Sequence, residues 1–134
     1  MKSTRMISVI ALLVVGLCVA AWARDTYVPS TTELTKEQKA MLVSLNSDKA
    51  QERAKAAEKL GVQCCKQAVE VVTQMMKSDD VASLRIVAAN ALWKIGDSRC
   101  ITAIREQAQV DKSKTVRTAL AAIAERFEKG EKAS

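Results

Sequence analysis

The sequence predicts an all-α fold, a short α-solenoid of about three helical hairpins. The first observation is an internal repeat at a constant interval, which relates the segment 85–97 to segments that begin at Arg53 and Arg117. Each copy carries small or apolar residues three, four and seven positions after its arginine, which is the spacing of one face of an α-helix. A fixed period of about 32 residues is typical of stacked helical repeats. The composition agrees, because one proline and four glycines in 134 residues supply few of the turns that a β-rich fold needs.

Residues 1–23 have the pattern of a secretory signal peptide. Two basic residues near the start precede an uncharged stretch, Met6–Ala23, that ends in an A-x-A sequence. We therefore expect cleavage between Ala23 and Arg24, and a periplasmic or secreted protein. An uncleaved membrane anchor is the alternative, because an uncharged stretch of about 18 residues approaches the length of a thin membrane span. Without such an anchor no membrane contact is expected.

Residues 24–34 contain the only proline of the chain, Pro29, and are expected to form an extended lead-in. Thr35 and Gln38 then have the spacing of a capping box, so a short helix should begin here and run to about Leu45. This segment corresponds to the second helix of a repeat, and we expect it to cover the N-terminal end of the stack.

The repeat domain is predicted to span residues 35–128, followed by a charged, flexible tail at residues 129–134. Acidic and hydroxyl residues precede each first helix, as suits helix N-caps. The third first helix, residues 117–127, is expected to lack a second helix as its partner. The second helices share the period, with these equivalent apolar pairs: Val69 and Ile101, Val72 and Ile104.

The central copy has an arginine, an Ala-Ala-x-x-Leu core and a Gly-Asp end, at Arg85, Ala88, Ala89, Leu92, Gly96 and Asp97. This pattern resembles the short HEAT-like repeats of the phycobilisome-lyase type, here in what we expect to be a secreted bacterial protein. The first copy departs from the pattern because Gly61 lies three positions early, and the third copy ends before any Gly-Asp pair. The resemblance covers about residues 34–127, and it implies a fold rather than a function.

The resemblance also implies a ladder of aspartate–arginine pairs that ties adjacent repeats together. An aspartate lies five or six positions before each of the three repeat arginines. We expect a repeat-stacking role, rather than an anion-binding row, for Asp48, Asp80 and Asp111 with Arg53, Arg85 and Arg117. As exposed ion pairs, they would each contribute less than ~1 kcal/mol.

Three cysteines, Cys64, Cys65 and Cys100, lie outside the predicted leader. In an oxidising compartment thiols tend to pair, and all three fall near the predicted turns between helices. A disulfide from Cys64 or Cys65 to Cys100 is one expectation, and the third cysteine would then be idle, buried or paired with another chain. A metal site is not expected, because three cysteines without histidine or C-x-x-C spacing make an incomplete zinc ligand set.

The sequence contains no histidine, no nucleophile–base pair and no glycine-rich phosphate loop, so we predict no enzyme activity and no cofactor. The net charge of +6 is scattered among acidic residues, which argues against a nucleic-acid partner. The favoured function is a non-enzymatic scaffold that binds a protein partner through the concave face of the solenoid, lined by the second helices. A small cysteine-dependent redox or bilin-lyase-like enzyme is the alternative.

The candidate partner-binding residues lie off the apolar stripe of the second helices or at the edge of the core: Gln67, Glu70, Gln74, Trp93, Thr102, Arg105 and Glu106. For Trp93, packing in the core is the alternative to an interface role. A monomer is favoured over a homodimer. The dimer would use a two-fold contact between two copies of the last helix, if an apolar strip of this helix stays exposed. The apolar residues of the helix are Val116, Leu120, Ile123 and Phe127, together with Ala119, Ala121, Ala122 and Ala124.

Overall fold

The computed structural model describes residues 33–131, and every regular element in this range is helical. The signal peptide predicted for residues 1–23 and nearly all of the lead-in lie outside it. Within the described range, no helix has the length and apolar character needed to cross a membrane. The elements are α2 (Lys36–Ser44), α3 (Ala50–Val62), the 3₁₀ turn η1 (Lys66–Ala68), α4 (Val69–Ser78), α5 (Ala82–Ile95), α6 (Ser98–Val110) and α7 (Lys114–Glu128).

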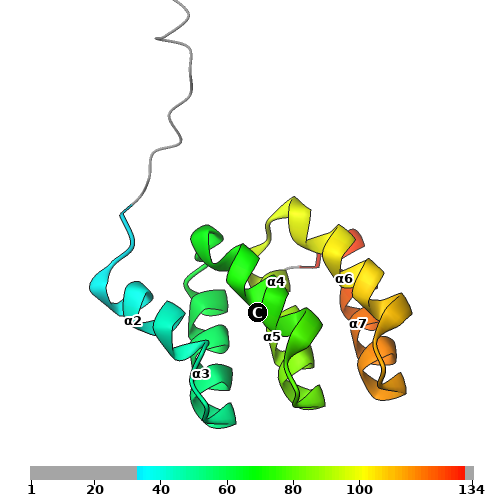
Figure 1. Cartoon of the computed structure of the whole chain (residues 1–134). Coiled ribbons are helices and arrows are strands. Elements are labelled where there is room, and N and C mark those ends of the chain that lie inside the picture. Colours follow the sequence, from blue (N-terminus) through cyan, green and yellow to red (C-terminus); the bar gives the residue numbers. More distant parts are fainter. Residues whose placement is uncertain (1–32, 132–134) are drawn as a thin grey trace, which may run out of the picture. The chain divides into compact units, whose positions relative to one another are not determined.

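The helices from Leu34 onward form one compact unit and stack as three hairpins (Figure 1). α2 packs against α3, α4 against α5 and α6 against α7, while α3, α5 and α7 form a row in chain order. This arrangement confirms the predicted short α-solenoid of about three hairpins. The pairing of the helices differs from the expectation. Each hairpin joins a helix predicted as the second of one repeat to the helix predicted as the first of the next repeat. α7 therefore has a partner helix, α6, contrary to the expectation that it would lack one.

α2 begins at a capping box formed by Thr35 and Gln38. Thr35 Oγ1 accepts a hydrogen bond from the Gln38 N–H at 3.1 Å, and Gln38 Oε1 accepts one from the Thr35 N–H at 3.0 Å. Both N–H groups lie at a helix start, where the helix itself offers them no acceptor. α2 then contributes Met41 and the following Leu45 to the common core, and it packs against α3 at the N-terminal end of the stack.

The polar residues before α3, α5 and α7 mainly shape the preceding turns. The N-caps of α3 and α5 are Lys49 and Val81, which make no side-chain capping bond, whereas Ser113 does cap α7. In all three turns a side-chain oxygen accepts the N–H two residues further on, as in Asx- and Ser-turns. These bonds join the Lys49 N–H to Ser47 Oγ (3.2 Å), the Val81 N–H to Asp79 Oδ1 (2.9 Å) and the Ser113 N–H to Asp111 Oδ1 (2.9 Å).

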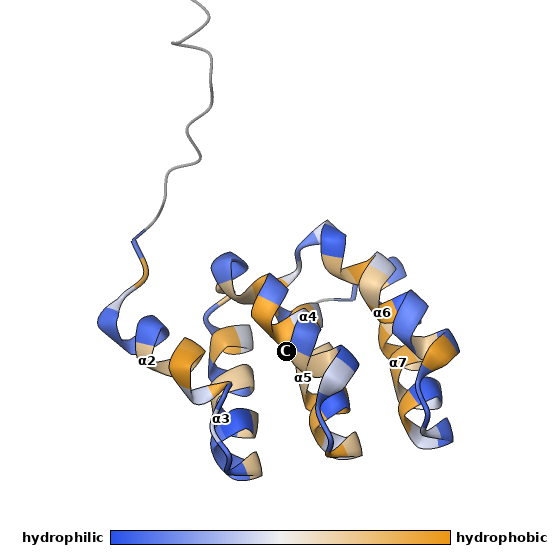
Figure 2. Ribbon diagram, viewed as in Figure 1, coloured by the Kyte–Doolittle hydropathy of each residue, from blue (hydrophilic) through white to orange (hydrophobic). Residues whose placement is uncertain are grey.

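The core is aliphatic and follows the repeat period of the sequence. Leu60 of α3 and Leu92 of α5 are fully buried at equivalent positions, as are Val72 of α4 and Ile104 of α6. Apolar residues line the helices, and the turns that lead into α3, α5 and α7 are mostly hydrophilic (Figure 2). Burying one large aliphatic side chain contributes about 1.5–3 kcal/mol, so this shared core is the main stabilising contribution.

The apolar strip that the sequence placed on the surface of the last helix is buried. Val116 and Leu120 are fully buried, Ile123 is 5% exposed, and Phe127 packs against the core. α6 covers this side of α7 because the two helices form one hairpin. These four side chains therefore cannot carry the predicted homodimer contact, whereas Ala121 and Ala122 of the same helix are exposed.

Gly61 and Gly96 have different roles, which explains why the first copy departs from the Gly-Asp pattern. A Cβ atom at Gly61 would lie 2.9 Å from the Cα of Ala91, so this glycine allows α3 to approach α5 closely. Gly96 ends α5 in the left-handed conformation (φ 70°), and its equivalent one repeat earlier is Cys64 (φ 49°). A residue other than glycine costs roughly 1–2 kcal/mol in this conformation, so α3 ends in a strained turn.

The segment 129–131, predicted as part of a flexible tail, is an ordered helix cap. Gly130 has a left-handed backbone (φ 67°). Its N–H donates to the carbonyl of Phe127, and the N–H of Glu131 donates to the carbonyl of Arg126, both at 3.1 Å. These two bonds are those of a Schellman motif, which satisfies carbonyls at a helix end. The rest of the predicted tail lies outside the described residues.

Candidate functional site

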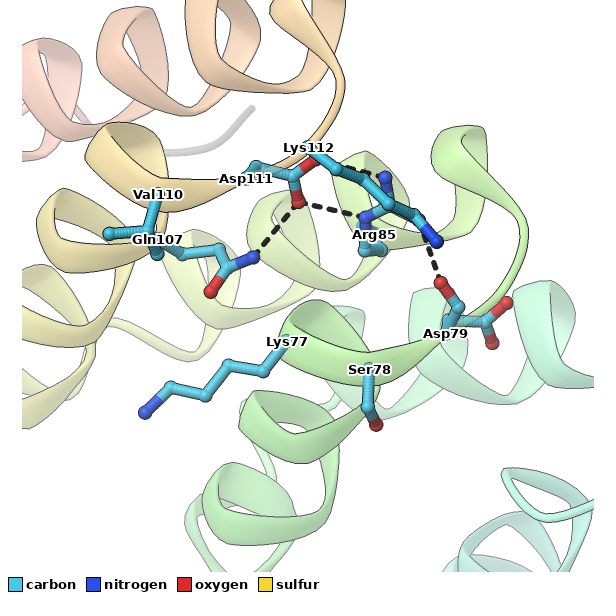
Figure 3. A pocket seen from close by; sticks show the side chains of 8 residues that line it. All are labelled: Lys77, Ser78, Asp79, Arg85, Gln107, Val110, Asp111 and Lys112. Carbon is cyan, nitrogen blue, oxygen red and sulfur yellow. Dashed lines mark hydrogen bonds and ion pairs between the residues drawn. The ribbon is translucent and has the colours of Figure 1, made fainter.

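Arg85, the first residue of the central repeat, is 2% exposed and forms a bidentate ion pair with a carboxylate. Its Nε and Nη2 donate to Asp111 at 2.8 and 2.9 Å, and its Nη1 donates to the carbonyl of Asp79 at 2.7 Å (Figure 3). Asp111 also accepts hydrogen bonds from Gln107 Nε2 and from the N–H of Ser113, each at 2.9 Å. The pair thus ties α5 to the turn between α6 and α7.

Arg53 makes equivalent contacts one repeat earlier. Its Nε and Nη2 donate to the carboxylate of Asp79 at 2.8 and 3.1 Å. Its Nη1 donates to the carbonyls of Ser47 and Asp48 at 2.8 and 3.2 Å. Each arginine therefore holds the aspartate 26 residues later, not the one just before it. Two of the aspartates predicted for the ladder do not contribute their carboxylates. Asp48 contributes only its carbonyl, and Asp80 makes no hydrogen bond or ion pair within residues 33–131.

The third arginine of the series, Arg117, forms only part of this arrangement. Its Nη1 donates to the carbonyl of Asp111 at 2.6 Å, just as Nη1 of Arg85 donates to the carbonyl of Asp79. No acceptor for its Nε and Nη2 is present in the described part of the chain. The carboxylate of Asp111 is bound to Arg85 of the preceding repeat.

The two arginines keep their aspartates in the charged form. The hydrogen bonds from Arg85 hold the pKa of Asp111 well below its usual range, although burial opposes this shift. Burial raises the pKa of Asp79, but the hydrogen bonds from Arg53 and the Val81 N–H outweigh it, so this pKa is also lowered. Because these carboxylates are already bound by donors on both oxygens, they serve the stacking of repeats rather than proton transfer.

An open, polar hollow of about 400 Å³ lies over the Arg85–Asp111 pair (Figure 3). Its edge includes two exposed lysines, Lys77 and Lys112, and the 74% exposed Val110. The charges at its base neutralise one another, so the hollow offers no free carboxylate and no reactive group. Its complete lining is Lys77, Ser78, Asp79, Arg85, Gln107, Val110, Asp111 and Lys112.

Six of the seven candidate partner-binding residues are exposed on η1, α4 and α6: Gln67, Glu70, Gln74, Thr102, Arg105 and Glu106. Arg105 forms an ion pair with Glu128 of α7 across the edge of this surface. A second hollow, of about 430 Å³, lies beside that pair between α6 and α7. Val71 and Val110 add exposed apolar area to α4 and α6. The result is a mixed polar and apolar surface.

Trp93, the seventh candidate, is buried rather than available as an interface anchor. It is 8% exposed, and its indole Nε1 donates to the carbonyl of Glu131 at 3.0 Å. The guanidinium of Arg126 lies 4.0 Å from the centre of the ring, a cation–π contact. The packing alternative therefore holds for Trp93, and the C-terminal turn covers it.

The three cysteines of the described chain are free thiols, so the predicted disulfide between Cys64 or Cys65 and Cys100 is not formed. Cys64 is exposed, whereas the other two are buried. Burial raises the pKa of Cys100 to about 11, which makes this thiol a poor nucleophile at neutral pH. Among residues 33–131, no group of three or more acidic or cysteine side chains is placed to hold a metal ion.

Asp79 and Gln107 belong to the ladder, and neither was predicted from the sequence. The repeat period does indicate Asp79, which lies one full repeat before Asp111. Asp80 was predicted instead because it lies nearer to Arg85 in the sequence. Gln107 has no counterpart in the preceding repeat, where Met75 occupies the equivalent position, so the period gave no signal for it.

The family of HEAT repeats matches residues 39–124, well over half of the sequence. The match extends from within α2 to within α7, so it includes all three hairpins and the arginine–aspartate ladder. A search of curated proteins finds no match to the sequence. On the extent of the repeat match, the chain belongs to the HEAT repeat family.

Proposed function

We propose that the protein is a non-enzymatic interaction module that binds a protein partner through the exposed sides of α4 and α6, as the concave face of the solenoid. One observation carries this proposal. Two neighbouring helices present uninterrupted rows of exposed side chains, and none of these side chains is needed to close the core. Stacked repeats of this kind provide extended surfaces for binding, and membership of the HEAT repeat family supports the same role.

The side chains of this face indicate what kind of partner it accepts. Glu70 and Glu106 alternate with Lys77 and Arg105, and amide and hydroxyl groups lie between them. Such a surface suits a mixed-charge protein surface that offers both donors and acceptors. It does not suit the evenly negative backbone of a nucleic acid, because the acidic residues interrupt the positive charge.

We place the protein in the periplasm or outside the cell, because residues 1–23 have the pattern of a signal peptide. Expression of the full sequence in a bacterial host is expected to yield a protein that begins at Arg24. Intact-mass measurement of the protein from the periplasmic fraction checks this start. Recovery of the full-length chain from the membrane fraction would instead support the anchor.

The enzymatic alternative has less support. A cysteine-dependent reaction needs an accessible thiolate beside an activating group. Cys100 is buried with a raised pKa, and the exposed Cys64 donates only to the backbone carbonyls of Val62 and Lys94. The finer likeness to phycobilisome-lyase-type repeats supplies no reactive group beyond these cysteines. No cofactor is part of the proposed function.

Site-specific photo-cross-linking tests the proposed face. A photoreactive residue at Gln74 on α4 or at Thr102 on α6 is expected to capture the same partner protein from a periplasmic or secreted extract of the source cells. The same residue at Lys55, which is exposed on α3, is the matched control and should capture none of it. Equal capture at Lys55 and Gln74, or capture at Lys55 alone, would contradict this location for the site.

Charge reversal provides the quantitative form of the same test. Glu106→Arg on α6 is expected to weaken binding of the captured partner by about tenfold or more, since like charges then meet across the interface. Glu58→Arg makes the same change on exposed α3 and should leave the dissociation constant unaltered. Calorimetric titration with the purified partner separates the two outcomes.

A further inference from the structure

The outer side of α7 carries the same contact residues that earlier helices use for stacking. Ala57 of α3 and Ala89 of α5 are fully buried, yet their equivalent on α7, Ala121, is exposed. Each of these alanines lies four positions after a ladder arginine and therefore on the same helix face. α7 stands at the end of the row of first helices, with no further helix of the described chain on this side (Figure 1). The face keeps the form of a stacking surface but has nothing stacked on it.

Arg117 makes this face a carboxylate receptor as well. Its guanidinium is anchored through Nη1 to the carbonyl of Asp111. In Arg53 and Arg85 the same anchor leaves Nε and Nη2 directed at a carboxylate, which both arginines bind with two hydrogen bonds. In Arg117 these two donors have no acceptor in the described chain. The ligand that fits here is therefore a carboxylate next to a closely approaching helix.

The order of the charges along α7 indicates which helix can pack against this face. Lys114 and Arg117 lie in the first turns of α7, and Glu125 and Glu128 in its last turns, with Ala121 midway between them. A helix dipole favours the opposite order, with acids at the start and bases at the end. The order does suit a second copy of α7 running antiparallel across Ala121. In that arrangement each positive position of one helix faces a negative position of the other.

We propose that the protein forms a two-fold homodimer through the exposed face of α7, with the two-fold axis passing by Ala121. Arg117 forms a bidentate ion pair with Glu125 of the partner subunit, as Arg53 and Arg85 do with their aspartates. Lys114 faces Glu128 of the partner subunit. The small side chain of Ala121 allows the two helices to approach as closely as α3 approaches α5. This contact does not use the buried apolar residues of α7, but it adjoins the α4–α6 face, because Ala121, Glu125 and Glu128 line the same hollow as Arg105 and Glu106.

The present partners of the two glutamates do not oppose this dimer. Glu125 pairs with Lys129, and Glu128 pairs with Arg105, all with well-exposed side chains. Exposed ion pairs of this kind contribute little to stability, so their carboxylates can be shared or exchanged. In a two-fold contact between two copies of this face, each positive position of one copy lies opposite a negative position of the other. An unrelated helix would need the same order of charges to fit equally well.

Sedimentation equilibrium of the mature protein, at tens to hundreds of micromolar, tests the dimer. The wild type is expected to show a reversible monomer–dimer equilibrium that salt weakens. Arg117→Glu and Glu125→Arg should each raise the dissociation constant by about tenfold or more, because each change breaks two symmetry-related contacts. The double variant with both changes should restore association. The control is Lys55→Glu on exposed α3, which should leave it unchanged.

A cysteine at the proposed axis gives a second, independent measurement. Ala121→Cys in a Cys64→Ser background is expected to form a covalent dimer on mild oxidation, because the two copies of residue 121 meet at the axis. Gln51→Cys, exposed on α3, should not form one in the same background. A wild type that remains monomeric at the highest concentration would overturn the proposal. A double charge variant that associates no better than the single variants, with all folded by circular dichroism, would also overturn it.

Discussion

Replacing Asp111 with alanine is expected to lower the free energy of unfolding by about 3–5 kcal/mol, because it leaves a buried arginine without its counter-ion. Arg85 is 2% exposed, so its guanidinium has little contact with bulk water to replace the lost bonds. Gln107 Nε2 and the Ser113 N–H lose an acceptor in the same substitution. Urea titration followed by circular dichroism measures the change, with an unaltered slope showing that the unfolding transition is otherwise the same.

Asp80→Ala is the matched control for this prediction. Asp80 is the residue that the sequence placed in the ladder, but it is exposed and makes no ion pair in the described chain. Its replacement should change the free energy of unfolding by no more than ~0.5 kcal/mol. Removing both charges together, as Arg85→Met with Asp111→Leu, should recover much of the stability, because no uncompensated charge remains. Equal effects of Asp80→Ala and Asp111→Ala would contradict the observed pairing.

The same pair makes stability depend on pH in the acid range. The pKa of Asp111 is lowered in the folded protein, so the folded state binds its proton less readily than the unfolded state, whose pKa is about 3.9. The stabilising contribution is therefore complete above the unfolded-state pKa and is lost as the pH falls below it. Asp79 shifts in the same direction. Without Asp111, the variant should lose less free energy than the wild type between neutral pH and this acid range.

The repeat period could be predicted from the sequence because apolar spacing and the three arginines act locally along each helix. Which helices pair in a hairpin could not be predicted, since the period is the same for either pairing of neighbouring helices. The contacts of α6 with α7 show which pairing is formed. The need for glycine at position 61 could not be predicted either, because it arises from the close approach of Ala91 on another helix.

The candidate site was predictable to a similar extent. Exposure of the α4 and α6 residues followed from their place off the apolar stripe, a property of one helix. The acidic partners of the arginines lie 26 residues away and depend on how the turns of successive repeats meet. The position of Trp93 depended on the turn after α7, which returns a backbone carbonyl to its indole. Such contacts between distant segments leave no local pattern to recognise.

Trp93→Ala is expected to destabilise the protein by about 3–5 kcal/mol, the range for removal of a large buried aromatic side chain. The indole fills the space between α5 and the C-terminal turn, bonded to Glu131 and covered by Arg126. Its loss leaves a cavity and releases that turn. The free energy of unfolding from urea titration measures the first effect. Faster hydrogen exchange at the amides of Gly130 and Glu131 measures the second.

Trp93→Phe separates packing from the hydrogen bond. A phenyl ring keeps most of the apolar contact and the face for Arg126, but it cannot donate to the carbonyl of Glu131. The expected loss is smaller, about 1–2 kcal/mol, because the freed carbonyl lies at an exposed residue and can bind water. Replacing a buried packing residue lowers the free energy of unfolding, whereas replacing an interface anchor weakens partner binding and changes stability little. If Trp93→Ala left stability within ~1 kcal/mol of wild type but abolished partner binding, Trp93 would be an anchor after all, and the C-terminal turn would have to open to expose it.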